Sequence, residues 1–168
     1  MTTKEKLLAL LEDSKGTFFS GEEIARTLQV SRAAVWKAVS ALREDGYTID
    51  AATNKGYRLS PDSDILSPQG IRRFLKPEYR DLDLTVLPTA PSTNALVREK
   101  ANQGRPEGCI IIACEQTDGR GRYGRQFFSP VDSGVYLSLL LRPTAYSPQQ
   151  ATCLTAAAAA ASSRFFRA

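Results

Sequence analysis

The sequence of 168 residues contains no histidine. Without an imidazole it cannot form a Ser-His-Asp triad, a Cys-His nucleophile pair or an HExxH zinc site. The three cysteines (Cys109, Cys114 and Cys153) are an odd number without CxxC spacing. They indicate reduced, mostly buried thiols rather than a disulfide framework or a zinc cluster, and we expect no protein-bound metal site. Any catalysis must therefore use Lys, Arg, carboxylates, the backbone or bound ions.

Long hydrophobic runs are also lacking. The longest, residues 156–161, is far shorter than the roughly 20 residues that a membrane-spanning helix needs. The N-terminal segment lacks the apolar core and cleavage site of a signal peptide, so we expect a cytoplasmic protein without a membrane partner. With 42% hydrophobic and 24% charged residues the composition is that of a folded globular protein, and the net charge of +4 is too small to indicate nucleic acid by itself.

Three helices are predicted within the first sixty residues. Capping boxes at Thr2 and Ser20, each with a glutamate three residues later, begin the first two, and Ser31 caps the third. Two short strands, residues 47–50 and 57–59, follow with an Asn-Lys-Gly turn between them. This order predicts a winged helix-turn-helix domain over residues 1–60; the alternative is a plain three-helix bundle with a hairpin.

The placement of positive charge favours the winged helix-turn-helix. Residues 31–43 contain three basic side chains and no acid, at the position of a recognition helix. Trp36 is equally consistent with packing and with DNA contact, and Arg43 with a role at the helix C-terminus. The candidate DNA-binding residues are Ser31, Arg32, Ala33, Trp36, Lys37 and, at the hairpin tip, Lys55.

The polar, proline-containing residues 61–66 indicate a linker, with a second domain over residues 67–168. We expect a helix after Ser67, another after the Pro91-Ser92-Thr93-Asn94 segment, and a last one from Pro148. Strands are expected near residues 82–87, 109–113 and 135–141. Helices and strands are mixed without strict alternation, so the expected fold class is α+β, with a mixed α/β layer in the second domain.

Residues 115–130, EQTDGRGRYGRQFFSP, alternate glycine with arginine. Glycine lets the backbone approach a ligand, and guanidinium groups bind carboxylate or phosphate oxygens, so an anion-binding loop is predicted. A solvated basic loop or an RGG-like nucleic-acid segment are the alternatives. Because the hydroxyls and amide of residues 92–94 follow another strand, the two strand ends are expected to converge on one pocket.

The segments PSTN (residues 91–94), EQTDGRGRYGRQFFSP and GVYLSLLLRP (134–143) resemble the bacterial biotin protein ligases. SRAAVWKAVSALREDGYTI and NKGYRL resemble the DNA-binding domain of the bifunctional members, which also repress the biotin operon. The resemblance implies a winged helix-turn-helix followed by the first half of a biotin/lipoate ligase-type catalytic domain. The implied reaction joins biotin and MgATP into biotinyl-5'-AMP and transfers biotin to a lysine of a biotin carboxyl carrier protein. It also implies operator DNA as a partner, and a homodimer is possible in such a family.

Carried over by position, the resemblance implies that Arg120 and Arg122 are catalytic, closing over the carboxylate and the adenylate phosphate. Arg122 and Phe127 would contact the adenylate, although the family usually has tryptophan near Phe127 and a basic residue at Tyr123. The implied biotin-binding residues are Ser92, Thr93, Asn94, Gln116, Gly119, Arg120, Gly121 and Arg122. The implied small molecules are biotin, ATP and Mg²⁺.

A lysine-containing KWPND-type segment of the family has no counterpart here, so the sequence is expected to be truncated within the catalytic domain and inactive as a ligase. A DNA-binding transcription regulator without ligase activity is the alternative. Lipoate or octanoate transfer is a third possibility, which the arginine-glycine loop and the winged helix disfavour.

Overall fold

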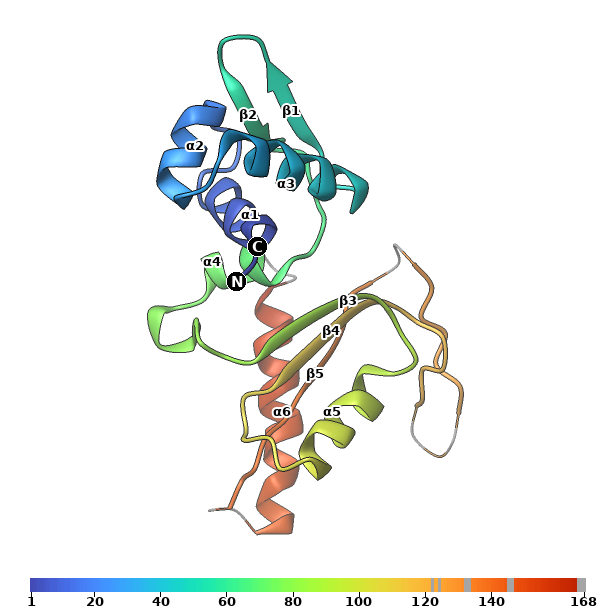
Figure 1. The fold of residues 1–168 in the computed structure, drawn as a ribbon. Coiled ribbons are helices and arrows are strands. Elements are labelled where there is room, and N and C mark those ends of the chain that lie inside the picture. Colours follow the sequence, from blue (N-terminus) through green and yellow to red (C-terminus); the bar gives the residue numbers. More distant parts are fainter. Residues whose placement is uncertain (122, 124, 132–133, 145–146, 166–168) are drawn as a thin grey trace. The chain divides into compact units, whose positions relative to one another are not determined.

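A computed structural model describes residues 1–121, 123, 125–131, 134–144 and 147–165 (Figure 1). The chain divides into two compact units, Met1–Val86 and Leu87–Ala168, and the division falls inside a strand. The α+β class predicted from the sequence is confirmed by the helices and sheets of the two units.

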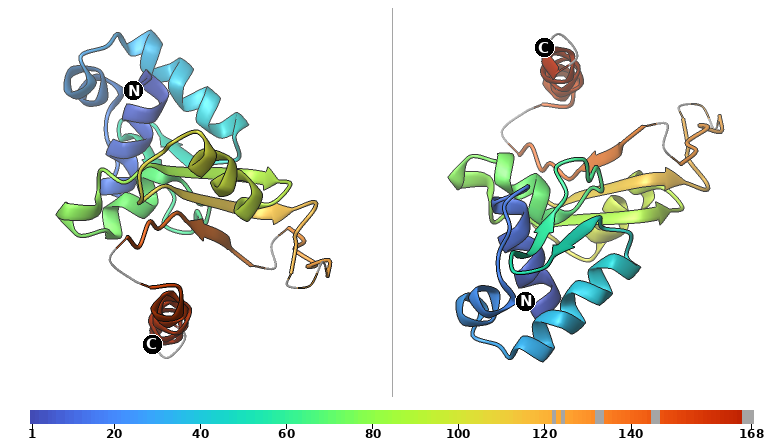
Figure 2. Two further views of the ribbon diagram at one scale, coloured as in Figure 1. Left: turned by 90° about the horizontal axis from the view of Figure 1, so that it is seen from below. Right: turned by 90° about the horizontal axis from the view of Figure 1, so that it is seen from above.

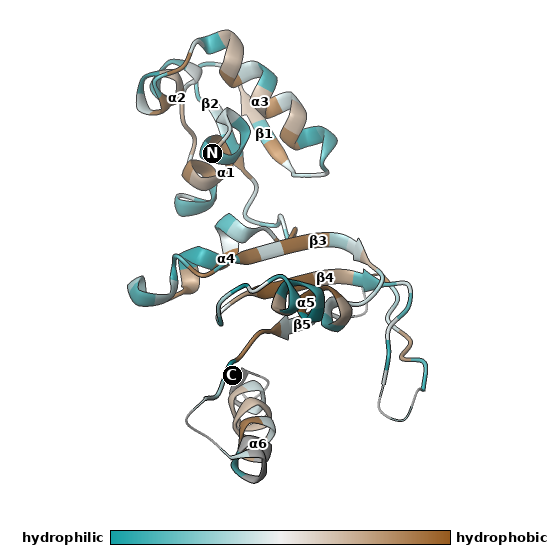
Figure 3. Ribbon diagram, turned by 60° about the horizontal axis from the view of Figure 1, so that its bottom comes forward, coloured by the Kyte–Doolittle hydropathy of each residue, from teal (hydrophilic) through white to brown (hydrophobic). Residues whose placement is uncertain are grey.

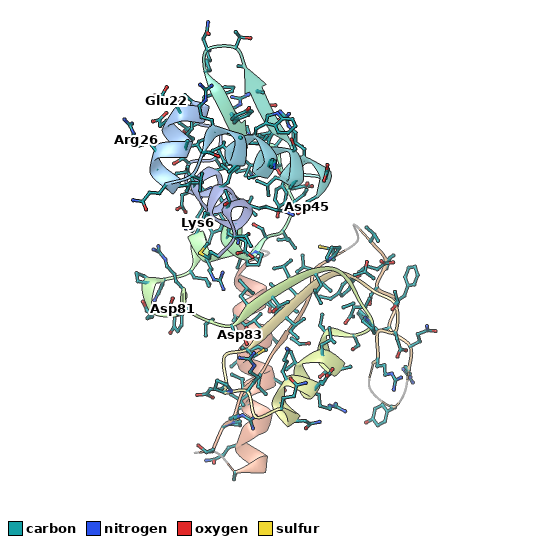
Figure 4. The ribbon with its side chains drawn as sticks, viewed as in Figure 1. Lys6, Glu22, Arg26, Asp45, Asp81 and Asp83 are labelled. Atoms are coloured by element: carbon teal, nitrogen blue, oxygen red, sulfur yellow. The ribbon has the colours of Figure 1, made fainter. Side chains whose placement is uncertain are left out.

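Three helices form the body of the first unit: α1 (Thr3–Asp13), α2 (Gly21–Leu28) and α3 (Arg32–Glu44). The capping boxes at Thr2 and Ser20 and the cap at Ser31 are all present, so the predicted starts are confirmed. Leucine, isoleucine and valine side chains spaced three or four apart bury one face of each helix in a common core. Glu22 and Arg26 project from the opposite face of α2 (Figure 4).

Strands β1 (Ile49–Ala52) and β2 (Gly56–Leu59) form an antiparallel hairpin in which Ile49 pairs with Leu59 and Ala52 with Gly56. Positive φ angles at Asn54 and Gly56 turn the chain at the tip. The hairpin is fixed to the helices by backbone bonds in both directions between Phe19 and Tyr57, of 2.9 and 2.8 Å. The predicted wing is therefore part of the first unit.

Residues 60–86 belong to the same unit and include α4 (Pro68–Phe74) and the 3-10 turn η1 (Pro77–Tyr79). The predicted linker, residues 61–66, packs here: Ser63 is buried, Lys15 donates to its carbonyl, and Ile65 contacts the helical core. Ser63 N–H also donates to Ser60 O at 3.1 Å, a contact that the polarity of the segment does not indicate. The domain boundaries at residues 60 and 67 stay predictions.

Strands β3 (Leu84–Ala90), β4 (Ile110–Gln116) and β5 (Tyr136–Leu139) form a sheet in that order. β4 and β5 are antiparallel, with Ile111 opposite Ser138. Helix α5 (Thr93–Asn102) covers one face of the sheet (Figures 1 and 2) and buries Val97 against Cys109, Ile111 and Leu140. This packing places the N-terminus of α5 beside β4 and β5.

Along residues 135–141 the side chains alternate between the two faces of the sheet. Those that do not face α5 are exposed: Val135, Leu137, Leu139 and Leu141. Figure 3 shows the hydrophobic colouring that runs along the strands of this sheet. The last helix, α6, spans Pro148–Phe165. Within the described ranges, no helix is both long enough and apolar enough to cross a membrane.

Candidate functional site

The first unit has an open groove of about 690 Å³ between the N-terminal half of α3 and the hairpin. Arg32, Ala33 and Trp36 line it from the helix, and residues 51–54 with Tyr57 line it from the hairpin. Trp36 is 62% exposed, so its indole is not a core residue, although a packing role was equally consistent with the sequence. An exposed tryptophan beside an arginine provides stacking and charge to a ligand in the groove.

The remaining predicted DNA-binding residues are each next in sequence to a residue that lines the groove. Ser31 uses its side chain as the cap of α3, accepting from the Ala34 N–H at 3.2 Å, and Lys37 is exposed one residue after Trp36. Lys55 is exposed at the hairpin tip, with its ammonium 6.0 Å from the Phe18 ring.

Arg43, at the other end of α3, has a structural contact. Its guanidinium donates to the Ile49 carbonyl through Nε (3.1 Å) and Nη2 (2.7 Å), which ties α3 to the first strand of the hairpin. The sequence indicated only a favourable interaction with the helix C-terminus.

In the second unit the ends of β3 and β4 converge as the sequence predicts. Backbone bonds join Thr117 N–H to Ala90 O (3.0 Å) and Asp118 N–H to Pro91 O (2.8 Å). The helix α5 begins at this point, so the first residues of α5 and the last residue of β4 become neighbours. Thr93 donates to Gln116 Oε1 from both its N–H (2.8 Å) and its hydroxyl (3.1 Å).

The arginine-glycine loop folds back on itself next to Gln116. Phe127 N–H donates to Gly119 O (2.8 Å), and Gly121 N–H donates to Arg125 O (2.8 Å). A Cβ at Gly119 would lie 2.6 Å from Phe127 O and 2.9 Å from Ser129 Oγ, so only glycine fits this buried position. The sequence predicted glycine for close approach to a ligand, whereas Gly119 approaches the protein's own backbone.

Two arginines of the loop, Arg120 and Arg122, are predicted to bind anionic groups. Arg120 is exposed and donates to Asp118 Oδ2 through Nη2 (2.9 Å) and Nε (3.2 Å). Both side chains of this ion pair are exposed to solvent. The Arg120 guanidinium can therefore leave Asp118 and bind an anionic ligand at a small cost in free energy. Arg122 lies outside the described residues.

The three residues at the start of α5 differ in burial and in hydrogen bonding. Ser92 is buried and caps the helix by accepting from Ala95 N–H at 3.4 Å, Thr93 is buried against Gln116, and Asn94 is exposed. Ser92 and Thr93 therefore already have protein partners, and Asn94 is the one whose side chain is open to solvent.

A shallow pocket of about 380 Å³ adjoins Gln116 and is lined by the loop residues 126–130. Phe127 is 54% exposed and packs edge-on against Tyr136, with ring centroids 6.5 Å apart and an angle of 82°. Phe128 is more exposed and also lines the pocket. The two rings thus present apolar surface to this pocket, and the contact of Phe127 with the adenylate stays a prediction.

Sequence analysis did not identify two residues of this cluster, Ser129 and Ser138. Ser138 Oγ lies 2.9 Å from Thr93 Oγ1, and Gln116 Nε2 donates to Ser129 Oγ at 3.2 Å. The sequence does contain a signal for Ser138, because in strand β5 this serine stands between two leucines, Leu137 and Leu139. Ser129 has none, since a serine in a loop is ordinary.

Comparison with known proteins identifies both units. Residues 3–58 match the HTH domain model, and residues 86–166 match the biotin/lipoate A/B protein ligase family. Relatives named bifunctional ligase/repressor BirA are 40% identical over 142 residues in Bacillus subtilis and 36% identical over 141 residues in Escherichia coli. The chain therefore combines an HTH domain with a domain of the biotin/lipoate A/B protein ligase family.

The alignments to both ligase/repressors cover 84% of this chain, so the relationship includes both units. The chain spans 44% of the length of the Bacillus subtilis relative and 42% of that from Escherichia coli. The family assignment made from the PSTN segment, the arginine-glycine loop and the winged helix is therefore confirmed.

Proposed function

We propose that this chain binds biotin in its second unit and operator DNA of biotin genes in its first, as a member of the ligase/repressor family. The observation that carries the proposal is the convergence of Thr93 and Gln116, 23 residues apart, beside the arginine-glycine loop. Gln116 lines the pocket together with the exposed rings of Phe127 and Phe128, and Arg120 lies in the same loop, paired with Asp118. A small ligand with a polar head and a carboxylate suits this combination.

The proposed ligase reaction requires two anions to meet. The biotin carboxylate bonds to the α-phosphorus of ATP as pyrophosphate leaves, and a lysine amine of the biotin carboxyl carrier protein then attacks the acyl carbon and releases AMP. Arg120 and Arg122 are proposed to balance the negative charge that accumulates in the first step, and Phe127 to cover the adenine. Gln116, Thr93, Ser92, Asn94, Gly119 and Gly121 are proposed to form the biotin side of the site.

Mg²⁺ has no residue assigned to it in this proposal. Throughout the described part of the chain, no three carboxylates or cysteines gather as a metal-ligand set. We propose that the ion arrives with the phosphates of ATP, where it offsets their charge.

For DNA, the supporting feature is the groove between α3 and the wing. Helix α3 exposes Arg32, Trp36 and Lys37 on the side away from the core, which leaves them available to bases and phosphates. Lys55 at the wing tip supplies a further positive charge for a neighbouring phosphate.

Isothermal titration with biotin, and with lipoate as the competing ligand class, tests the second unit. Binding of biotin alone is expected; binding of lipoate alone would assign the site to lipoate chemistry.

A mixture with MgATP and a carrier domain then tests ligation, and labelling would contradict the expectation of an inactive chain. If biotin does not bind but operator DNA shifts in a gel, the chain is a DNA-binding regulator only. Size-exclusion chromatography with and without biotin tests for the homodimer.

A further inference from the structure

The hydrogen bonds around Gln116 have a single consistent direction. Thr93 N–H can only donate, so the Gln116 atom 2.8 Å away must be the amide oxygen. The other end of the amide is then the NH₂ group, which donates to Ser129 Oγ at 3.2 Å. The Ser129 hydroxyl uses its own proton toward Phe127 O at 3.2 Å, because a carbonyl can only accept.

The direction extends to the other end of the chain of bonds. Thr93 Oγ1 lies 3.1 Å from Gln116 Oε1, an acceptor, so the threonine hydroxyl donates there. Ser138, 2.9 Å from the same hydroxyl, must therefore donate to Thr93. Each side chain therefore donates to the next in the order Ser138, Thr93, Gln116 and Ser129. This row of hydrogen bonds runs from strand β5 to the arginine-glycine loop.

We propose that Ser129 and Ser138 are positioning residues of the ligand site, acting through Gln116 and Thr93. Ser129 is 3% exposed, and its carbonyl also accepts from Gln116 N–H at 3.0 Å. It holds the Gln116 amide with its NH₂ toward the loop, which leaves the second hydrogen of that group for an acceptor atom of the ligand. Ser138 prevents the Thr93 hydroxyl from rotating away from Gln116.

The proposal rests on biotin as the ligand of the second unit, and its first test is biotin affinity. Losing one buried hydrogen bond of this kind corresponds to about a five- to tenfold rise in Kd. We expect that rise for Ser129→Ala and for Ser138→Ala. Ser138→Thr keeps the hydroxyl on a strand and is expected to restore affinity. Ser162→Ala is the matched control, because that hydroxyl is exposed and bonds to Ala158 O of its own helix, away from Gln116 in sequence and in hydrogen bonding.

A double-mutant cycle separates positioning from general damage to the fold. If Ser129 acts through Gln116, Ser129→Ala has no further effect on Kd when Gln116 is already alanine. An equal loss in both backgrounds, or no loss in either, would overturn the proposal.

Failure of biotin to bind would count against the proposed function. A measurement without ligand distinguishes that outcome from failure of the positioning proposal. The side-chain amide signals of Gln116, identified by their disappearance in Gln116→Ala, report the bonds directly in a ¹⁵N-correlation spectrum without ligand. Ser129→Ala is expected to shift them while the backbone spectrum stays folded, and Ser162→Ala to leave them in place. Unshifted signals in Ser129→Ala would remove its positioning role whatever biotin does.

Discussion

Ser67 donates a hydrogen bond of 3.2 Å to the carboxylate of Glu12, and both side chains are buried although 55 residues separate them. Ser67 also accepts from Gly70 N–H at 2.9 Å, as the cap of α4. One hydroxyl thus fastens residues 60–75 to α1 and begins the next helix.

Ser67→Ala should lower the free energy of unfolding of the first unit by about 2–3 kcal/mol, because it removes a helix cap and a donor to a buried carboxylate. Chemical denaturation monitored by circular dichroism measures the change. Ser67→Thr retains the hydroxyl and should recover part of the loss. An unchanged midpoint in Ser67→Ala would show that the contact contributes nothing to stability.

The pH dependence of stability above neutrality should include a contribution from Tyr47. Burial raises the pKa of Tyr47 above its ordinary 10.0, a hydrogen bond with Ser67 acts in the opposite direction, and the charges of Glu12 and Asp45 raise it further. Below about pH 10 the tyrosine is protonated in both states and has no effect. Above that pH the unfolded state loses the proton first, so the free energy of unfolding falls as pH rises.

Denaturation curves between pH 8 and 11 for wild type and Tyr47→Phe measure this contribution. The fall in stability should be shallower in the variant, and Tyr79→Phe, at an exposed ring, corrects for the general loss of a hydroxyl. Identical slopes for wild type and Tyr47→Phe would contradict the expectation.

Gly56→Ala should prevent the hairpin from closing on the helices. A Cβ there would lie 2.0 Å from Phe19 O, and φ is +95°. Gly46 has a similar φ of +93°, but its nearest atom would be Ile65 Cδ1 at 3.4 Å. Gly46→Ala should therefore cost only the backbone strain of about 1–2 kcal/mol, and Gly56→Ala considerably more. Thermal unfolding of the two variants compares them directly, and equal losses would show that the close approach is relieved by movement.

Gly119→Ala should weaken biotin binding and lower stability together, since its Cβ would displace Phe127 O and Ser129 Oγ from the loop fold. Titration calorimetry and denaturation on the same samples measure both quantities. The comparison for stability is Gly121→Ala, where the nearest atom, Arg125 O, would be 3.4 Å away. If Gly119→Ala keeps the stability of wild type, the loop accommodates a side chain at this position.

Trp36→Ala separates the two interpretations of that residue. Because the indole is largely exposed, the free energy of unfolding should change by less than about 1 kcal/mol, while affinity for operator DNA should fall. Lys37→Ala should also weaken binding and reduce its salt dependence by about one phosphate contact. Gel shifts over a range of salt concentrations measure both. A destabilised Trp36→Ala with unchanged DNA affinity would return the residue to a packing role.

Local sequence patterns predicted the helices of the first unit well. The capping boxes at Thr2 and Ser20 and the apolar spacing of α3 act within a few residues, so they can be recognised without knowing the fold. The packing of residues 61–66 against α1 was not predictable in the same way, because serine and proline indicate a break in secondary structure but not what the segment contacts.

At the proposed ligand site the sequence determined which residue types are present: the hydroxyls after β3, the glutamine at the end of β4 and the arginine-glycine loop. The tertiary structure decided that Thr93 bonds to Gln116, that Ser129 and Ser138 join them, and that Arg120 lies in solvent beside Asp118. The physical reason is the range of the interactions. Helix caps and turns depend on neighbouring residues, whereas side-chain hydrogen bonds between strands depend on the register of the sheet, which only packing of the whole unit fixes.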